Sequence, residues 1–320
     1  MDPLQLHNAS RRSLEQTPNP RRVVLIHTGV ILLVSLLLSV VDHLLNRQIG
    51  TTGGLSGLDT RSMLTTIQSL LRLAQMILLP FWQIGYTYYT LRVARQQEAG
   101  LSDLAQGFRR FGPVLRLQLL TGGMLMVVAV GCAYLSSFLF ALLPGSSALM
   151  ESILSLAESD LSEEVLIETL GNAYLETLTP FMIVYAVLLV AGVVFVLFRY
   201  RMANLWLMDH PDGRALAALV GGRKILRGNW KAIFRVDLHF WWFYLLEVLV
   251  TVLCYGDKLL SVMGVEMTLD AFGNYLIVFC VYLFAQLALY GWKGNEVSVT
   301  YAHAYLSLLP EEAKKVPEEI

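Results

Sequence analysis

The sequence predicts an all-α protein, a polytopic bundle of membrane helices, and three observations support this fold class. Hydrophobic residues make up 55% of the 320 residues and charged residues 15%, whereas soluble domains average about 45–50% apolar and about 25% charged. Apolar runs recur along the chain, each near the ~20 residues that a membrane span requires. Basic residues gather in alternate connecting segments, as they do in multi-pass proteins. Together these features predict six transmembrane helices and amphipathic surface helices between them.

The chain begins with a polar lead, residues 1–22, which ends in two arginines. The first predicted span, 23–45, follows directly. Its apolar core is longer than the 7–15 residues, roughly, of a signal peptide, so we expect a span that is not cleaved.

A six-span membrane domain is predicted over residues 23–309, followed by a charged tail, 310–320. After the first span, the remaining spans are predicted at 73–91, 117–143, 180–198, 233–254 and 272–292. The fifth is the least apolar of them because it contains Asp237, His239 and Glu247.

The distribution of basic residues predicts the orientation of the chain. The lead, the second-to-third connector, the fourth-to-fifth connector and the tail hold four, five, eight and three basic residues, which is 20 of the 24. Arg47, Arg61 and Lys258 fall on the other side. Because Lys and Arg are retained in cytoplasmic loops, we expect both termini in the cytoplasm. The loop 146–179, with seven acids and no base, is predicted to form an acidic, helical cap on the outer face.

Two inner connectors resemble each other. Apolar residues fall at helical spacing before span three, over 101–115, and before span five, over 216–233. The segment from Phe111 to Arg116 aligns with the segment from Trp230 to Arg235. A third such stripe, over 297–308, follows span six. Basic helices with one apolar stripe lie in the plane of anionic membranes. Gly221, Gly222 and Gly228 are expected to break the second connector helix.

Four segments carry a resemblance to a known family. They are GYTYYTLRVARQQEAGLSDLAQGFRRFG (85–112), RYRMANLWLMDHP (199–211), GRKILRGNWKAIFRVDLHFWWFYLLEVLVTVLCYGD (222–257) and VSVTYAHAYLSL (297–308). They resemble the bacterial integral membrane proteins called domain of unknown function 975. The span–surface-helix–span pattern is also similar to the membrane domain of some glycerophosphodiester phosphodiesterases. The first resemblance implies a bacterial plasma-membrane protein and brings no catalytic residues.

Glu247 is the candidate intramembrane polar site. Ionisable groups within spans are costly and usually face a bundle interior or a water-filled cavity. The functional interpretation is a proton or cation site, with Arg72 at the mouth of span two as a partner. The alternative is a neutral or paired acid of structural role. Asp237 and His239 form either a proton relay or an interfacial cluster beside neighbouring tryptophans.

A second candidate site is the basic connector before span five. A spacing of four residues places Arg223, Arg227, Lys231 and Arg235 on one helical stripe. The alternatives are ordinary positive-inside topology and binding of an anionic headgroup or a phosphorylated partner. Its residues are Arg199, Arg201, Arg223, Lys224, Arg227, Trp230, Lys231 and Arg235.

The sequence predicts no enzyme, cofactor or metal site. It contains no Walker-type loop, no H-E-x-x-H, no G-x-S-x-G and no dinucleotide fingerprint, and its three cysteines lack C-x-x-C spacing. The net charge of −1 does not favour nucleic acid. We expect a membrane scaffold or accessory protein that contacts lipids, with anionic headgroups at the cytoplasmic face, or other membrane proteins. The alternative is a small transporter or channel that uses Glu247. A water cavity at Glu247 would favour transport, and a sealed apolar bundle would favour the scaffold.

Overall fold

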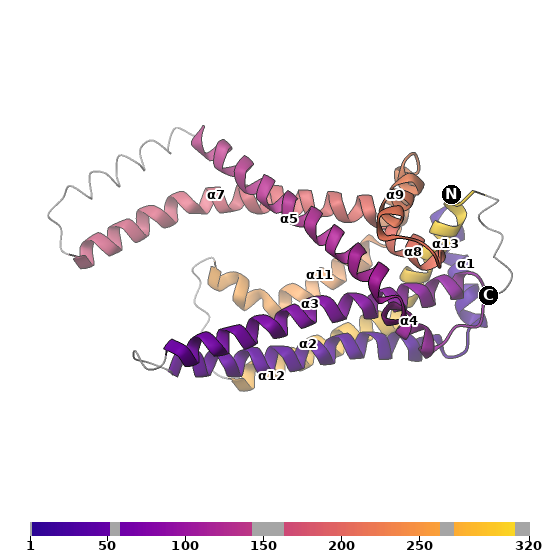
Figure 1. Cartoon of the computed structure of the whole chain (residues 1–320), viewed down its shortest axis with the longest axis horizontal. Coiled ribbons are helices and arrows are strands. Elements are labelled where there is room, and N and C mark those ends of the chain that lie inside the picture. Colours follow the sequence, from indigo (N-terminus) through magenta and orange to yellow (C-terminus); the bar gives the residue numbers. More distant parts are fainter. Residues whose placement is uncertain (1, 52–57, 143–162, 263–271, 311–320) are drawn as a thin grey trace. The chain divides into compact units, whose positions relative to one another are not determined.

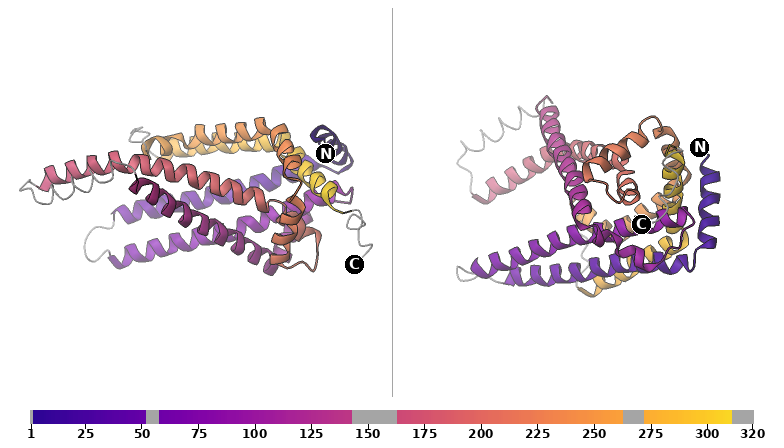
Figure 2. Two further views of the ribbon diagram at one scale, coloured as in Figure 1. Left: turned by 90° about the horizontal axis from the view of Figure 1, so that it is seen from above. Right: turned by 45° about the vertical axis from the view of Figure 1, so that its right-hand side comes forward.

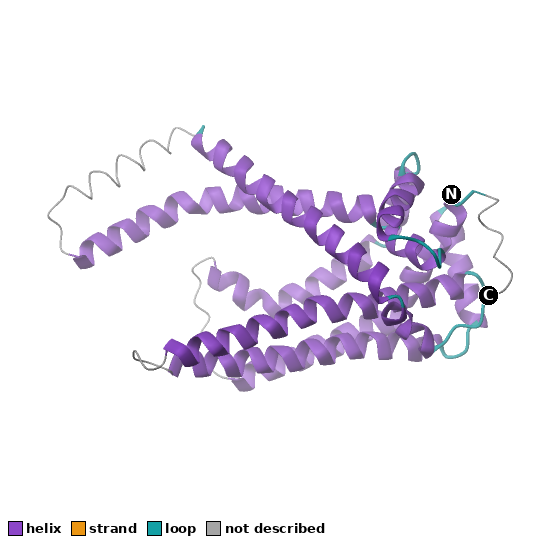
Figure 3. Cartoon of the chain, in the orientation of Figure 1, coloured by secondary structure: helices purple, strands orange, loops and turns teal. Residues whose placement is uncertain are grey.

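The computed structural model describes residues 2–51, 58–142, 163–262 and 272–310, which are helices joined by short turns, without a strand in these ranges (Figure 3). The predicted all-α fold class is confirmed for this part of the chain. The elements, labelled in Figure 1, are α1 (Pro3–Gln16), α2 (Pro20–Thr51), α3 (Leu58–Ala94), η2 (Leu101–Ala105), α4 (Gln106–Arg109), α5 (Phe111–Ala141), α7 (Glu163–Tyr200), α8 (Ala203–Asp209), α9 (Ala215–Leu226), α10 (Trp230–His239), α11 (Trp241–Val262), α12 (Phe272–Leu289), η3 (Tyr290–Gly294) and α13 (Asn295–Leu308).

Among the described residues, four helices are long and apolar enough to cross a membrane, and they indicate a membrane location. They are Pro20–Leu38, Ser62–Ala94, Phe111–Ala141 and Phe181–Asp209. A shorter apolar helix covers Trp241–Val252. Large apolar side chains such as Met126, Val127 and Tyr134 are exposed, as expected of a surface that faces lipid rather than water.

The chain divides into two compact units, one formed by Met1–Leu117 with Met202–Ile320 and the other by Gln118–Arg201. In the first unit, α2 and α3 run side by side, and α12 packs on α2 and on α11 (Figure 1). Helix α13 packs along α1 and against α3 (Figure 2). All helices that carry the candidate Glu247 site therefore belong to the first unit.

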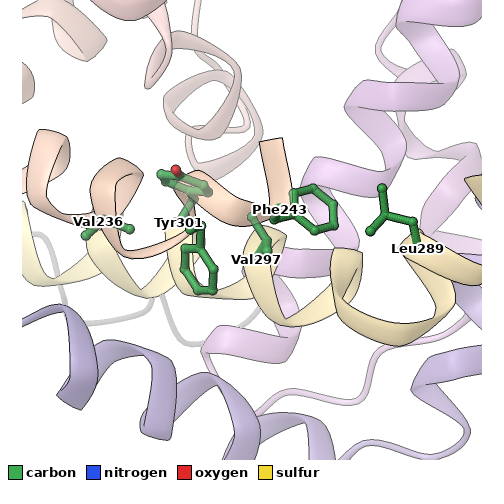
Figure 4. Packing of buried hydrophobic residues seen from close by; sticks show 6 residues of the cluster. Val236, Phe243, Leu289, Val297 and Tyr301 are labelled. Carbon is green, nitrogen blue, oxygen red and sulfur yellow. The ribbon is translucent and has the colours of Figure 1, made fainter. Parts of the chain in front are cut away.

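The hydrophobic core of the first unit includes a cluster where α10, α11, α12 and α13 meet, formed by Val236, Phe240, Phe243, Leu289, Val297 and Tyr301 (Figure 4). Helix α13 differs from the surface helix expected over 297–308. Val299, Ala302 and Tyr305 are buried as well as Val297 and Tyr301, so the helix is buried on more than one face. Its small residues and its tyrosines, whose hydroxyls find partners, allow this burial.

The connector before α5 is not one continuous helix. A short 3₁₀ segment, η2, leads into the single turn of α4, and both lie against α3. Two glycines permit this backbone contact. A Cβ on Gly85 would lie 1.9 Å from the Leu104 carbonyl oxygen, and one on Gly107 would lie 1.9 Å from that of Phe81.

The connector before α11 breaks at one of the three glycines expected to break it. Gly228 has φ +91°, a left-handed backbone that favours glycine, and it separates α9 from α10. Helix α9 continues through Gly221 and Gly222. These two positions lack side chains because α8 packs there: a Cβ on Gly221 would lie 2.5 Å from the Trp206 indole, and one on Gly222 would lie 2.6 Å from the Ala203 backbone nitrogen.

The structure divides the predicted fifth span, 233–254, into two helices. Helix α10 ends at His239 and α11 begins at Trp241, because Phe240 departs from helical geometry with φ −103° and ψ 16°. The Phe240 side chain is fully buried and belongs to the cluster formed with Val236 and Phe243. Burial of this ring fixes the bend, and it places Asp237 and His239 on a separate helix that precedes α11.

In the second unit, α5 and α7 approach each other closely at Gly192. A Cβ on Gly192 would lie 2.4 Å from a Val128 methyl carbon, so this glycine permits the close helix contact that small residues give in membranes. Helix α7 begins at Glu163, within the predicted cap, and continues through Gly171 without a break. The rest of the predicted acidic cap, 146–162, lies outside the described residues.

Candidate functional site

A polar cavity of about 250 Å³ lies at Glu247 within the first unit. Glu247 and Thr251 are one turn apart on α11 and share a face. Helices α2, α3 and α12 and the turn η3 supply the other walls. The lining residues, all in the described part of the chain, are His27, Thr28, Ile31, Leu32, Gln83, Glu247, Thr251, Tyr282, Gln286 and Tyr290.

Tyr290 donates a hydrogen bond to Glu247 Oε1, with the two oxygens 2.6 Å apart. Tyr290 begins η3, a π-helical turn that interrupts the join between α12 and α13. Such turns change the direction in which side chains point and are frequent at functional sites. Gly294 makes the turn possible, since a Cβ there would lie 2.6 Å from the Tyr290 ring. The π turn therefore positions the partner of Glu247.

The structure does not place Arg72 at this cavity. The residue of α3 that lines the cavity is Gln83, which lies about 16 Å along the helix from Arg72 at 1.5 Å per residue. The sequence-based pairing of Glu247 with Arg72 is therefore replaced by the bond from Tyr290. The pairing was predicted from the positions of the two residues in their spans. The distance along α3 between Arg72 and the cavity separates the two charged groups.

Two buried polar atoms at the cavity have no hydrogen-bond partner: His27 Nδ1 and Thr28 Oγ1. Each residue is 6% exposed. The His27 ring stacks on Tyr86, with centroids 4.1 Å apart, and lies parallel to Trp82. The Trp82 indole donates to the His27 carbonyl oxygen at 3.2 Å. The imidazole is thus held in place while its Nδ1 is left without a protein partner.

Asp237 and His239 contact different groups, and neither lines the Glu247 cavity. The Tyr301 hydroxyl donates to Asp237 Oδ1, and the Tyr301 and Tyr244 hydroxyl oxygens are 2.7 Å apart. Asp237 is therefore part of a tyrosine network between α10, α11 and α13, which favours its structural interpretation.

His239 belongs to a second network, which joins α1 to α10 and α13. Its Nε2 lies 3.1 Å from His7 Nδ1, and His7 Nε2 lies 2.9 Å from Glu296 Oε2. Lys293 donates to the same carboxylate oxygen at 2.6 Å. Burial raises the pKa of Glu296, but the hydrogen bonds from His7 and Lys293 outweigh it, so the pKa is below its ordinary value.

The basic residues of the connector between α8 and α11 are exposed along α9 and α10. Arg223 and Lys224 lie in the last turn of α9, Arg227 follows at its C-terminus, and Lys231 and Arg235 lie on α10. These five side chains give the connector a cationic surface.

Helix α10 has apolar residues on two faces. Ile233 and Val236 are fully buried, whereas Trp230, Phe234 and Leu238 are 52%, 52% and 60% exposed. The exposed three are spaced by four residues and form one stripe. The Lys231 ammonium lies 5.7 Å from the Trp230 ring centroid. The outer face of α10 therefore combines an apolar stripe with cations.

The similarity between the two connectors extends to exposure. Phe111 and Trp230 are both exposed, as are Arg116 and Arg235. The positions three and six after the aromatic residue are buried in each, at Val114 and Leu117 in one copy and at Ile233 and Val236 in the other. The local helices thus face their surroundings in the same way.

Arg199 and Arg201, which the sequence groups with the connector, belong to the second unit. There the Arg199 guanidinium lies 5.5 Å from the Phe195 ring centroid. The start of the connector, at the end of α8, is bound to other parts of the first unit by an ion pair and by hydrogen bonds. Arg95 pairs with Asp209, which also accepts a hydrogen bond from Tyr305 at 2.8 Å. Arg110 donates to the His210 carbonyl oxygen at 2.7 Å.

Sequence reasoning missed His7, Glu296 and Tyr290 as partners of the candidate residues. Glu296 is 289 residues from His7, and no local spacing joins them. Within the described residues, no group of three or more His, Cys, Asp or Glu residues could hold a metal ion. Comparison of the chain with protein-family models, with curated proteins and with solved structures gave no match.

Proposed function

We propose that this chain is a bacterial plasma-membrane protein of six spans with both termini in the cytoplasm, related to the family it resembles. Helices α11 and α12, of 22 and 18 residues, would supply the fifth and sixth spans. Their length at 1.5 Å per residue is about 33 Å and about 27 Å, close to the hydrocarbon thickness of about 30 Å. The distribution of basic residues supports this orientation.

Its proposed role is non-enzymatic: a membrane scaffold or accessory component whose cytoplasmic helices dock on anionic lipid headgroups. The outer face of α10 is the observation that carries this proposal. Trp230, Phe234 and Leu238 would enter the headgroup region, where aromatic side chains are favoured. Arg227, Lys231 and Arg235 would face the phosphates, each contributing about 1 kcal/mol near an anionic surface.

The two apolar faces of α10 have different roles in this proposal. The buried face, through Ile233 and Val236, fixes the helix to the protein. The exposed stripe is then free to contact lipid without unfolding. The anionic lipids bound at α10 would in turn recruit partner membrane proteins.

The experiment is native mass spectrometry of the purified chain after extraction from membranes that contain phosphatidylglycerol and phosphatidylcholine. We expect the double variant Lys231→Glu/Arg235→Glu to retain several-fold less phosphatidylglycerol, since each lost cation contributes about 1 kcal/mol and each reversal adds repulsion. The matched control is Arg11→Glu/Arg12→Glu, which reverses two exposed cations on α1. Equal retention in both variants would contradict the docking proposal.

A second candidate function, a small transporter or channel, is favoured by the cavity at Glu247. An acid in a polar cavity between helices is a feature expected of a transporter, whereas a scaffold needs no such cavity. Intramembrane ionisable groups commonly mark solute or proton paths. The two candidates use different parts of the first unit, so one protein can carry both properties.

A further inference from the structure

The Glu247 cavity has the chemistry of a binding site for a small cation. Its lining includes one acid and no Lys or Arg. The described contact to the carboxylate is the neutral Tyr290 hydroxyl. An ionised carboxylate inside a helix bundle requires a compensating charge or strong hydrogen bonds. A bound cation would supply the charge that the lining residues do not.

The unpartnered atoms indicate which kind of cation fits. Buried polar groups are nearly always hydrogen-bonded, and an exception calls for an explanation. Thr28 Oγ1 can accept a hydrogen bond, and His27 Nδ1 accepts one in the tautomer that carries hydrogen on Nε2. With Glu247 these residues offer three acceptors in one cavity. A primary ammonium group carries three N–H donors.

The volume and the aromatic walls agree with a small organic ammonium ion. The cavity, about 250 Å³, is below the range of roughly 300–1,000 Å³ that drug-sized ligands occupy. Tyr282 and Tyr290 line it, and aromatic rings attract ammonium groups. The Tyr290 bond to Glu247 orients the carboxylate, so that one oxygen is already engaged and the other can serve a ligand.

We propose that the cavity bounded by His27, Thr28 and Glu247 binds a primary ammonium group. The source is either a free small amine or the headgroup of an aminophospholipid such as phosphatidylethanolamine. This inference rests on the cavity of the second candidate function, but it requires binding only and not transport.

The test is isothermal titration calorimetry of the full chain in nanodiscs of phosphatidylcholine, a lipid without a primary ammonium group, with empty nanodiscs as the blank. The probes are methylammonium chloride and tetramethylammonium chloride, at constant ionic strength. We expect saturable binding of methylammonium and at least about tenfold weaker binding of tetramethylammonium, which has the charge but no N–H donors. No saturable methylammonium binding, or equal binding of both ions, would overturn the proposal.

Variants test the individual acceptors. Glu247→Gln should weaken methylammonium binding by about tenfold or more, because charge-assisted hydrogen bonds are the stronger kind. Thr28→Val should weaken it several-fold. Thr90→Val is the matched control, and its binding should be unchanged. Thr90 is a buried threonine of α3 that does not line the cavity, and its hydroxyl donates to the Thr87 backbone carbonyl at 2.8 Å. If Glu247→Gln does not fold, the two threonine variants still decide, and equal affinity in them would reject the site.

Two further arms separate the source and the function. Competition by phosphatidylethanolamine in the nanodisc would assign the site to a lipid headgroup, and no competition would assign it to a free amine. Uptake of labelled methylammonium into proteoliposomes tests transport independently. Binding without uptake would retain this inference and reject the transporter, whereas absence of binding would reject the inference and leave the lipid-docking role of α10 untouched.

Discussion

His303 shows how a single residue joins the N-terminal helix to the rest of the first unit. It lies on α13, and its Nε2 is 3.1 Å from the hydroxyl oxygen of the buried Ser13 on α1. Burial lowers the pKa of His303 below its ordinary value of 6.5. The folded chain therefore favours the neutral imidazole at this position.

This pKa shift predicts that acidification weakens the docking of α1. Because the folded pKa is depressed, the contribution of neutral His303 to stability is present above pH 6.5 and is lost as the pH falls below it. Hydrogen exchange at the amides of α1 and α13 should be faster at pH 5.5 than at pH 7.5 after correction for intrinsic rates. His303→Gln, which does not titrate, should reduce this acid effect. An unchanged acid effect in the variant would contradict the role assigned to His303.

Glu247 could be identified from the sequence as a candidate residue, but its contacts could not. Glu247 was identified because an acid within an apolar run is unusual, and the structure does place it at a polar cavity. Its partner could not be predicted, because Tyr290 reaches it only through the π turn of η3. Helical periodicity contains no sign of such a turn. The His27 ring stacks on Tyr86 of α3, a contact between helices that no local pattern shows.

At the scale of elements, apolar runs predicted the long helices well, because length and hydropathy are local properties. The four membrane-length helices contain the cores of the first four predicted spans. Helix ends and bends were harder to predict. Gly228 marks a break because its backbone is left-handed, whereas Gly221 and Gly222 serve helix packing. The bend at Phe240 depends on burial of its ring against other helices, which no local pattern shows.

Gly85 gives a sharp prediction about contacts between elements. Gly85→Ala would place a methyl carbon 1.9 Å from the Leu104 carbonyl oxygen, so α3 and η2 must separate. We expect a loss of about 1–3 kcal/mol in unfolding free energy, the usual cost of overpacking, seen as a lower melting temperature in detergent. Gly112→Ala is the control, because no atom lies within 4 Å of the position that its methyl group would occupy. Equal melting temperatures for the two variants would show that the contact does not contribute to stability.

At the scale of the whole molecule, helix packing defines the two units and the distribution of charge suggests the orientation. The division into two units was not expected from the sequence, because apolar runs do not reveal which helices pack together. The proposed orientation rests on charge alone, through the retention of Lys and Arg in cytoplasmic loops. The number of spans depends on α11 and α12, whose connection contains residues outside the described part.

The six-span proposal predicts that Lys258 is reached from outside the cell. It lies toward the end of α11, beyond the predicted fifth span. In a chain with Cys132, Cys254 and Cys280 changed to serine, the Lys258→Cys variant should react with a membrane-impermeant maleimide on intact cells. The Arg223→Cys variant, on the basic connector, should react only after the membrane is opened. If α11 and α12 did not cross the membrane, the chain would have four spans and position 258 would stay on the cytoplasmic side. Protection of position 258 on intact cells, with labelling after lysis, would therefore reject six spans in favour of four.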